Sequence, residues 1–211
     1  WKQPLNILSL NSQSLKIRYQ SNQLNENTID LIIKKFLTQI EFMSDTIDDF
    51  KNFFSISKEK MEFKVHEEIQ SIIKILESKI HSHDIKISIN KKFDCSITSY
   101  KNEFKQALFN IINNMIDIFD ERVIENPYIK IDIEYDYMDC VITLHDNGGG
   151  IATQLLPERL FEPYVTTKGE TGTGIGLQIT KDIIINSFNG EIKASNVDNG
   201  AQFIIKLPLI T

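Results

Sequence analysis

The chain has 211 residues, of which 41% are hydrophobic and 25% are charged, and its formal net charge is -6. These values are typical of a soluble globular protein with one large domain or two small ones. The negative charge argues against a nucleic-acid partner, because phosphate contacts need a basic patch that this sequence lacks. Every apolar run is far shorter than the ~20 residues that span a bilayer.

The chain begins at Trp1 rather than Met and carries no signal peptide. We therefore expect a piece of a longer protein that lies in the cytoplasm and makes no membrane contact of its own, whether or not a membrane-anchored sensor precedes it. Cys95 and Cys140 lie in alternating apolar stretches without CxxC spacing, which favours two buried, reduced thiols over a disulfide.

Two helical segments are predicted at the start of the chain. Apolar residues recur at alternating spacings of four and three in both segments, and polar residues from Gln20 to Asn27 separate them. This rhythm is the seam of a left-handed coiled coil or helical bundle. The seam residues are Leu5, Leu8, Leu15 and Tyr19, followed by Ile29, Ile33, Phe36, Ile40, Met43, Ile47, Phe50 and Phe54.

A helix from Asn27 to Phe53 would be roughly 40 Å long at ~1.5 Å per residue. Because two such helices bury little surface, we expect two chains to pair through this helical hairpin as a homodimeric four-helix bundle. The alternative is a helical subdomain packed on the rest of the same chain. We assign residues 1–57 to the hairpin and residues 58–211 to a second domain.

The second domain mixes strand and helix patterns. Its predicted helices carry an apolar stripe from Ile69 to Ile80 and cover Asn102 to Phe119 and Thr173 to Phe188. Short alternating segments between these helices predict a mixed sheet, since they do not follow a strict βαβ order. The predicted strands are residues 63–65, 85–89, 95–100, 129–135, 138–145, 192–194 and 203–207. The predicted fold class is α+β, with the helices on one face of the sheet.

Amide and carboxylate side chains form a stripe along the predicted helix from Asn102. Asn110, Asn113, Asn114 and Asp117 lie beside the apolar stripe at helical spacing. A solvated helix face would explain any one of them. Four together are harder to explain in that way, because Asn lowers helix stability relative to Ala. An amide oxygen can be one ligand of Mg²⁺ while phosphates and water supply the others.

Asp146 ends a predicted strand and precedes Gly148, Gly149 and Gly150. A carboxylate only accepts hydrogen bonds, so it matches the exocyclic amine of adenine and opposes the carbonyl of guanine. The residue therefore predicts adenine selectivity, and a turn-forming Asp is the alternative interpretation.

A second glycine cluster opens onto the predicted helix that ends at Phe188. Unpaired amides and the dipole at a helix start attract phosphate, so Gly172, Gly174 and Gly176 predict a phosphate cradle. A flexible surface loop is the alternative. The spacing matches neither a Walker A loop nor the Rossmann GxGxxG pattern.

Five segments in this order carry a resemblance: NIINN, DNGGGI, LFEPYVTTK, GTGIGL and NGAQFIIKLP. They resemble the asparagine box, first glycine box, phenylalanine box, second glycine box and final strand of sensor histidine kinases. The catalytic domain of that family belongs to the superfamily of DNA gyrase and the MutL repair ATPase. The resemblance covers Phe63 to Pro208 and implies an α/β sandwich of the Bergerat type that binds ATP and Mg²⁺.

The resemblance also implies roles for single residues. Asn114 would bind Mg²⁺, and Asn110 would orient phosphates during catalysis. Asp146 would bind adenine, Thr166 would begin a mobile lid, and Phe161 would anchor that lid. The implied cofactor-binding set is Asn110, Asn114, Asp117, Asp146, Gly148, Gly150, Ile151, Thr166, Thr167, Lys168, Gly172, Thr173, Gly174, Gly176 and Leu177. One departure is Met115, which stands where the family usually has Ala.

The first residues, from Trp1 to Leu5, resemble the end of an HQW[RK]QPLN phosphoacceptor box. By that likeness the acceptor histidine lies two positions before Trp1, and Gln3 would place a water for dephosphorylation about one helical turn later. None of the four histidines in the chain lies in the predicted hairpin, so none is expected to be the acceptor. They are His66, His81, His83 and His145.

The resemblance implies a kinase core that transfers the γ-phosphoryl of Mg-ATP to that upstream histidine. The phosphoryl group would then pass to an Asp in the receiver domain of a response regulator. One alternative is an ATP-driven conformational machine of the gyrase or MutL kind, although those enzymes carry a Glu base where Asn110 stands here. The other is a nucleotide-binding dimer or pseudokinase without transfer.

Overall fold

The computed structural model describes residues 2–23, 25, 28–38, 40, 59–166 and 174–209. The chain forms two compact units, Trp1–Ser55 and Ile56–Thr211. The predicted domain boundary, between residues 57 and 58, lies outside the described residues and stays a prediction.

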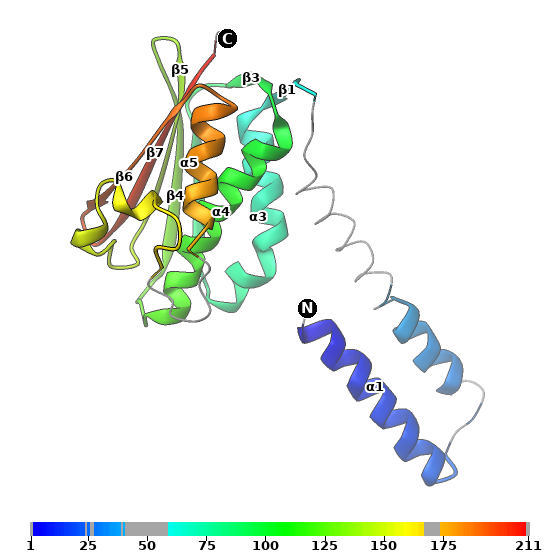
Figure 1. Ribbon diagram of the computed structural model, residues 1–211. Helices are drawn as coiled ribbons and strands as arrows, with labels where there is room; N and C mark the ends of the chain where they lie inside the picture. The colour runs from blue at the N-terminus through cyan, green and yellow to red at the C-terminus, as the bar shows by residue number, and fades with distance from the viewer. Residues whose placement is uncertain are drawn as a thin grey trace. The chain divides into compact units, whose positions relative to one another are not determined.

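The first unit contains helix α1 (Lys2–Gln20) and a second helix over residues 28–38 (Figure 1). Asn25 caps the second helix, because its Oδ1 accepts a 2.8 Å hydrogen bond from the backbone N–H of Thr28. The predicted second helix is thus observed in part, and its continuation over residues 41–53 lies outside the described residues. The side chain of Gln3, in α1, lies outside them as well.

Part of the predicted seam of the first unit is exposed within one chain. In the described part of the second helix, Ile32 is buried within one chain and Phe36 is half-buried. The predicted seam residues Ile29, Ile33 and Ile40 are 39%, 49% and 52% exposed. The inward face is therefore centred one residue away from Ile33, and the four-helix bundle stays a prediction.

The second unit contains a five-stranded sheet in the order β2-β4-β5-β7-β6. β2 pairs with β4 in parallel, and all other neighbours are antiparallel, so the sheet is mixed as predicted. The strands are β2 (Lys86–Lys91), β4 (Tyr128–Asp136), β5 (Asp139–Asp146), β6 (Glu191–Val197) and β7 (Gly200–Pro208).

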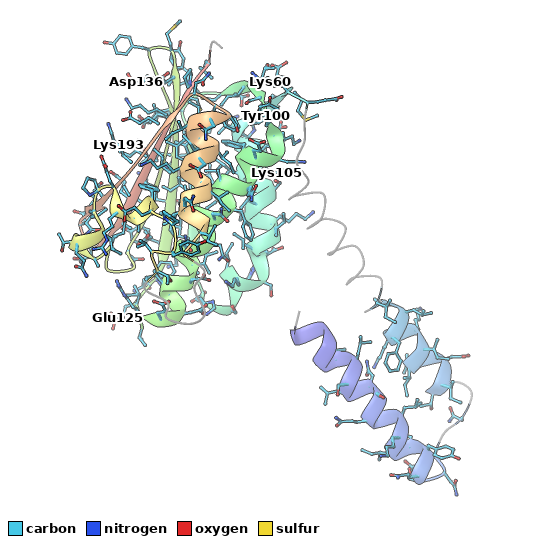
Figure 2. All side chains as sticks on the ribbon, viewed as in Figure 1. Lys60, Tyr100, Lys105, Glu125, Asp136 and Lys193 are labelled. Atoms are coloured by element: carbon cyan, nitrogen blue, oxygen red, sulfur yellow. The ribbon has the colours of Figure 1, made fainter. Side chains whose placement is uncertain are left out.

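Three helices cover one face of this sheet: α3 (Val65–Ser82), α4 (Lys101–Glu121) and α5 (Gly176–Asn186) (Figure 1). Alternate residues of β5 are buried, as expected for a strand with one face on a core. Phe104, Leu108 and Ile111 of α4 are fully buried, and the Phe104 ring packs on Phe63 and Phe188. The exposed Lys193 of β6 lies on the other side of the sheet (Figure 2).

One predicted strand pairs differently from the expectation. Residues 95–100 were expected to extend the main sheet, but β3 (Ser96–Ser99) pairs with β1 (Met61–Lys64) in a separate two-stranded antiparallel sheet. The strands contain only four residues each, and their partners are distant in the sequence. Alternation alone does not specify such a pairing.

Both cysteines are free and buried, as predicted. Burial raises the pKa of the Cys140 thiol, and its hydrogen bond with Cys95 raises that pKa further. Within the described ranges, no helix is both long enough and apolar enough to cross a bilayer.

Candidate functional site

A cavity of about 370 Å³ lies beside α4, between the segment that follows β5 and the start of α5. The structure brings most of the predicted cofactor-binding residues to its wall. Those lining it are Asn110, Asn114, Asp117, Asp146, Gly148, Gly150, Ile151, Thr166, Gly174, Gly176 and Leu177. The remaining four, Thr167, Lys168, Gly172 and Thr173, lie outside the described residues.

Asp146 lines this cavity as the last residue of β5 and is only 3% exposed. Its Oδ1 accepts hydrogen bonds from the backbone N–H groups of Gly148 (2.7 Å) and Ala201 (3.2 Å). Burial raises the pKa of this carboxyl, and the two backbone hydrogen bonds oppose that rise. Among the described residues no hydrogen bond reaches Oδ2, which leaves a fixed acceptor for a ligand.

In the turn after Asp146, position 148 accepts only glycine. A Cβ on Gly148 would lie 2.3 Å from Cγ2 of Ile118 on α4. Gly149 and Gly150 take φ values of +87° and +76°, in the left-handed region where glycine is favoured. The first glycine cluster therefore brings the backbone against α4 at one wall of the cavity.

Two side chains that the sequence did not single out hold this turn in place. Arg122 Nη1 donates to the carbonyl oxygens of Gly148 (2.6 Å) and Gly150 (3.3 Å). Asn196 of β6 makes two 2.7 Å hydrogen bonds with the backbone of Ile151, one to its N–H and one to its carbonyl. No spacing rule connects residues 122 or 196 to the glycines, because the pairings depend on tertiary packing.

Gly200 is a second position where the backbone approaches Asp146 closely. A Cβ there would lie 1.5 Å from the carbonyl oxygen of Asp146, well inside contact distance. The neighbouring Asn199 accepts a 2.8 Å hydrogen bond from the N–H of Gly149. The start of β7 therefore supports the glycine turn. In the sequence, this role was indicated only by the Asn-Gly pair before the final strand.

Asn110 connects α4 to the first turn of α5. Its Nδ2 donates to the carbonyl of Gly176 (3.0 Å) and to Oγ1 of Thr180 (3.4 Å). The buried Thr180 hydroxyl lies within 2.9 Å of the same Gly176 carbonyl and within 3.3 Å of the Ala107 carbonyl. This contact fixes the start of α5, where free helix amides can attract an anion.

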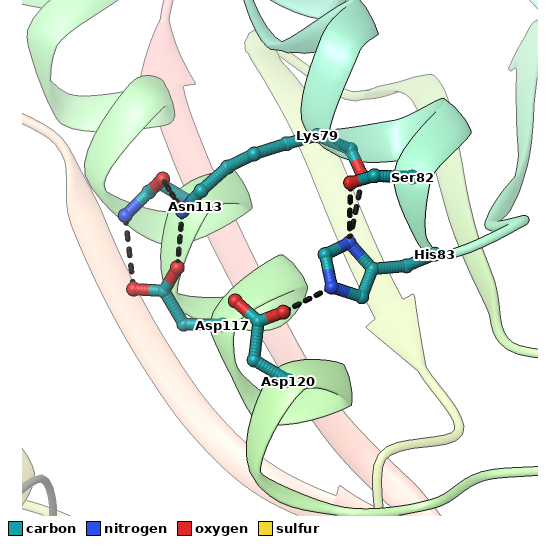
Figure 3. Close-up of polar contacts among 6 residues, drawn as sticks. All are labelled: Lys79, Ser82, His83, Asn113, Asp117 and Asp120. Carbon is teal, nitrogen blue, oxygen red and sulfur yellow. Dashed lines mark hydrogen bonds and ion pairs between the residues drawn. The ribbon is translucent and has the colours of Figure 1, made fainter. Parts of the chain in front are cut away.

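Asn113 and Asp117 form a polar cluster with Lys79 of α3 (Figure 3). Lys79 Nζ donates to Asn113 Oδ1 (3.0 Å) and Asp117 Oδ1 (2.5 Å), and Asn113 Nδ2 donates to Asp117 Oδ2 (3.1 Å). The predicted cofactor residue Asp117 thus has a cationic partner. Nothing in the sequence pattern connected residue 79 to it.

In the second glycine segment, a Cβ on Gly174 would lie 2.5 Å from the backbone of Tyr164, whereas Gly176 has open space around it. Gly174, at φ +64°, accepts a 2.9 Å hydrogen bond from the N–H of Tyr164. A Cβ on Gly176 would meet its nearest atom, in the Asn110 side chain, at 3.7 Å, which is ordinary contact. Phe161, the predicted lid anchor, is buried, and Lys181 Nζ of α5 lies 5.6 Å from its ring centre.

A family model, described as histidine kinase-, DNA gyrase B-, and HSP90-like ATPase, matches residues 100–211. The chain belongs to this ATPase family. The matched part contains all the described residues of the cavity, from Asn110 on α4 to Phe203 on β7.

The chain is also similar to sensor proteins. The two-component sensor PprA of Pseudomonas aeruginosa is 26% identical over 218 residues, which cover 99% of this chain and 23% of PprA. Sensor protein TdiS of Thauera aromatica is 32% identical over 149 residues, covering 69% of this chain and 27% of TdiS. The chain spans about a quarter of the length of these relatives.

Solved structures agree with these relationships. The catalytic domain of histidine kinase ThkA, in a nucleotide-free form, matches with a TM-score of 0.64 at 32% identity, covering 72% of this chain and 96% of that domain. The matches confirm the sensor histidine kinase resemblance inferred from the sequence and the mixed α/β fold of the catalytic part.

Proposed function

We propose that this chain is the ATP-binding kinase core of a two-component sensor histidine kinase. In the longer protein it transfers the γ-phosphoryl of Mg-ATP to a histidine just upstream of residue 1, and the phosphoryl group then passes to an Asp of a response-regulator receiver domain. The observation that carries this proposal is Asp146, a buried acceptor at the wall of a cavity in a chain of this ATPase family.

The adenine end of the proposed site is the wall formed by Asp146 and the glycine turn. With Oδ1 held by two backbone amides, Oδ2 is the acceptor for the exocyclic amine of adenine. Gly148 lets the turn lie against Ile118, where a Cβ would collide with that side chain. Guanine would present a carbonyl to the same carboxylate, and such an unmatched buried pair costs about 1 to 3 kcal/mol.

The phosphate end is the wall formed by α4 and the first turn of α5. Asn114 lines the cavity with an amide oxygen that suits Mg²⁺, and the bound ion would neutralise phosphate charge during transfer. Asn110 holds the start of α5 so that its free amides face the phosphates. Such transfer depends mainly on positioning and on charge neutralisation, and these residues supply both.

The first unit carries the residues proposed to act beside the acceptor and to contact the partners. Gln3 of α1 would stand about one helical turn after the upstream histidine and place a water for dephosphorylation. The exposed Ile29, Ile33 and Ile40 leave apolar surface for a second copy of this chain, which supports a homodimer. ThkA has been solved in complex with response regulator TrrA, and we propose a partner of the same kind here.

The gyrase or MutL kind of ATPase is the second candidate. Asn110 argues against it, because its amide nitrogen donates to Gly176 and an amide cannot act as the base that activates water. We expect this chain to hydrolyse ATP slowly. The third candidate, a nucleotide-binding pseudokinase, differs from the proposal only in the absence of phosphoryl transfer.

Calorimetric titration of the 211-residue chain with Mg-ATP and with Mg-GTP tests the site. We expect ATP to bind at least about 5-fold more tightly, because guanine would leave a carbonyl unpaired against the Asp146 carboxylate. Equal affinities for the two nucleotides would contradict the assignment of Asp146.

Incubation with γ-labelled ATP tests the transfer. The present chain should stay unlabelled, whereas a version extended upstream of Trp1 by its natural residues should take up acid-labile, base-stable label. Label of that kind on the present chain would show that the acceptor is one of its own histidines.

A further inference from the structure

Few cations line the described part of the cavity. Its charged wall residues are the carboxylates Asp117 and Asp146 and the guanidinium Arg122, and Arg122 already donates to two carbonyl oxygens of the glycine turn. The chain as a whole has a net charge of -6. A nucleotide triphosphate brings several further negative charges, so an uncompensated carboxylate beside its phosphates would weaken binding.

Asp117 is the carboxylate whose charge would repel the phosphates. It lies three residues after Asn114 on the same helix, and residues at that spacing are neighbours on one helix face. The amide proposed to hold Mg²⁺ and this carboxylate therefore line the same stretch of the cavity wall. Asp146, by contrast, belongs to the adenine end.

Lys79 supplies the compensating charge from a different helix. Its ammonium lies 2.5 Å from Asp117 Oδ1 and 3.0 Å from Asn113 Oδ1, and Asn113 closes the triangle with a 3.1 Å bond to Asp117 Oδ2 (Figure 3). Both carboxylate oxygens are thus held. The pair is partly screened from solvent, with side-chain exposures of 42% for Lys79 and 22% for Asp117.

The next acidic residue on α4 does not compete for Lys79. Asp120 pairs instead with His83, whose other ring nitrogen lies 2.8 Å from the Lys79 carbonyl oxygen (Figure 3). The ends of α3 and α4 are therefore joined by two separate polar contacts, of which only the Lys79 contact reaches residues that line the cavity.

We propose that Lys79 is a positioning residue of the nucleotide site: it neutralises Asp117 and fixes Asn113 and Asp117 so that a triphosphate can lie along α4. Lys79 itself is not among the residues lining the cavity, and it acts through the two side chains that are. The inference rests on the proposed function, because it presumes that Mg-ATP occupies this cavity.

Four variants of the 211-residue chain test it: Lys79→Met, Lys79→Arg, Asp117→Asn and the double variant Lys79→Met/Asp117→Asn. The affinity for Mg-ATP is measured by calorimetry, and the affinity for adenosine, which carries no phosphate, by NMR titration. We expect Lys79→Met to weaken ATP binding roughly 5- to 10-fold through the uncompensated charge and to change adenosine binding less than about 2-fold. Lys79→Arg should bind ATP like the unmodified chain.

The double variant distinguishes an effect of the Asp117 charge on ATP binding from a disruption of the local structure. Because Asp117→Asn removes the charge that Lys79 compensates, the double variant should recover ATP affinity to within about 2-fold of the unmodified chain. Lys74→Met, at an exposed position of the same helix, is the matched control and should leave both affinities unchanged.

Three results would overturn the inference: equal losses of ATP and adenosine affinity in Lys79→Met, no loss at all, or no recovery in the double variant. These are distinguishable from a failure of the proposed function. If the unmodified chain binds no ATP, or binds GTP equally well, the assignment of the cavity is wrong and the role of Lys79 falls with it.

Discussion

Gly148 and Gly176, at opposite ends of the cavity, are glycines for different reasons. A Cβ on Gly148 would collide with Ile118 at 2.3 Å. A Cβ on Gly200, which supports the same turn, would collide with the backbone of Asp146 at 1.5 Å. At the other end, a Cβ on Gly174 would lie 2.5 Å from the backbone of Tyr164, whereas a Cβ on Gly176 would be in ordinary contact at 3.7 Å. The fold therefore leaves no room at Gly148, Gly174 or Gly200, and Gly176 has room that a ligand can use.

This difference separates what the fold specifies from what the ligand specifies. The adenine end is fixed by packing and by the hydrogen bonds of Arg122 and Asn196 before any nucleotide arrives. The start of α5 is held by Asn110 and by the backbone bond between Tyr164 and Gly174. Substitution of Gly148 or Gly200 should therefore affect stability as well as binding, whereas substitution of Gly176 should affect binding alone.

Gly200→Ala should have the largest effect on stability. The added methyl has no space beside the Asp146 carbonyl, so β5 and β7 must separate locally, and overpacking of this kind costs about 3 kcal/mol or more. Urea unfolding of the 211-residue chain, followed by circular dichroism, measures the loss. A midpoint equal to that of the unmodified chain would contradict the idea that packing requires glycine here.

Asp146→Asn should alter specificity more than stability. The Asn Oδ1 can keep the two backbone hydrogen bonds, which places Nδ2 as a donor where the carboxylate offered an acceptor. We expect ATP affinity to fall about 10- to 100-fold while GTP affinity does not fall. Calorimetry with both nucleotides measures this change, and a parallel loss of both affinities would indicate a general disruption of the site.

Acidification should weaken ATP binding through the same carboxyl. Burial raises the pKa of Asp146 above its ordinary value of 3.8, and an ionised acceptor makes the stronger hydrogen bond. Affinity should therefore fall as the pH is lowered through that raised pKa. The Asp146→Asn variant should lack this component, and since both chains bind the same ATP, the titration of the ligand cancels in the comparison.

The same pKa shift makes an opposite prediction for stability. In the interval between the ordinary and the raised pKa, the folded chain keeps a proton that the unfolded chain has released. The contribution of Asp146 to stability should therefore decrease as the pH rises through this interval. Urea unfolding of the unmodified chain and of Asp146→Asn across the interval measures that contribution, and stability curves of the same shape would contradict it.

The sequence predicted the elements that carry strong periodicity. The helix with the asparagine stripe was expected from Asn102 to Phe119 and spans Lys101–Glu121, because its apolar and polar stripes repeat over many turns. The position of Asp146 at a strand end and the break at the first glycine cluster also followed from alternation and turn residues. Local patterns of this kind determine which residues line the cavity wall.

Contacts between distant elements were not predictable in the same way. Lys79 meets Asp117 only because α3 packs beside α4, and β3 pairs with β1 rather than with the main sheet. The sequence around Gly200 indicated only a turn, although a Cβ there would lie 1.5 Å from the carbonyl oxygen of Asp146. These features depend on tertiary packing, which periodicity does not encode.

Gly176→Ala should have the smallest effect on stability, and it tests the comparison most directly because it is the matched control for Gly200→Ala. Ala is favoured over Gly in a helix by up to about 1 kcal/mol, so the unfolding midpoint should stay unchanged or rise slightly. The methyl would nevertheless stand at the cavity wall, where free helix amides are proposed to meet phosphate, so ATP affinity should fall about 3-fold or more. A chain that lost stability without losing affinity would show that the glycine at the start of α5, like Gly200, is required by the fold rather than by the ligand.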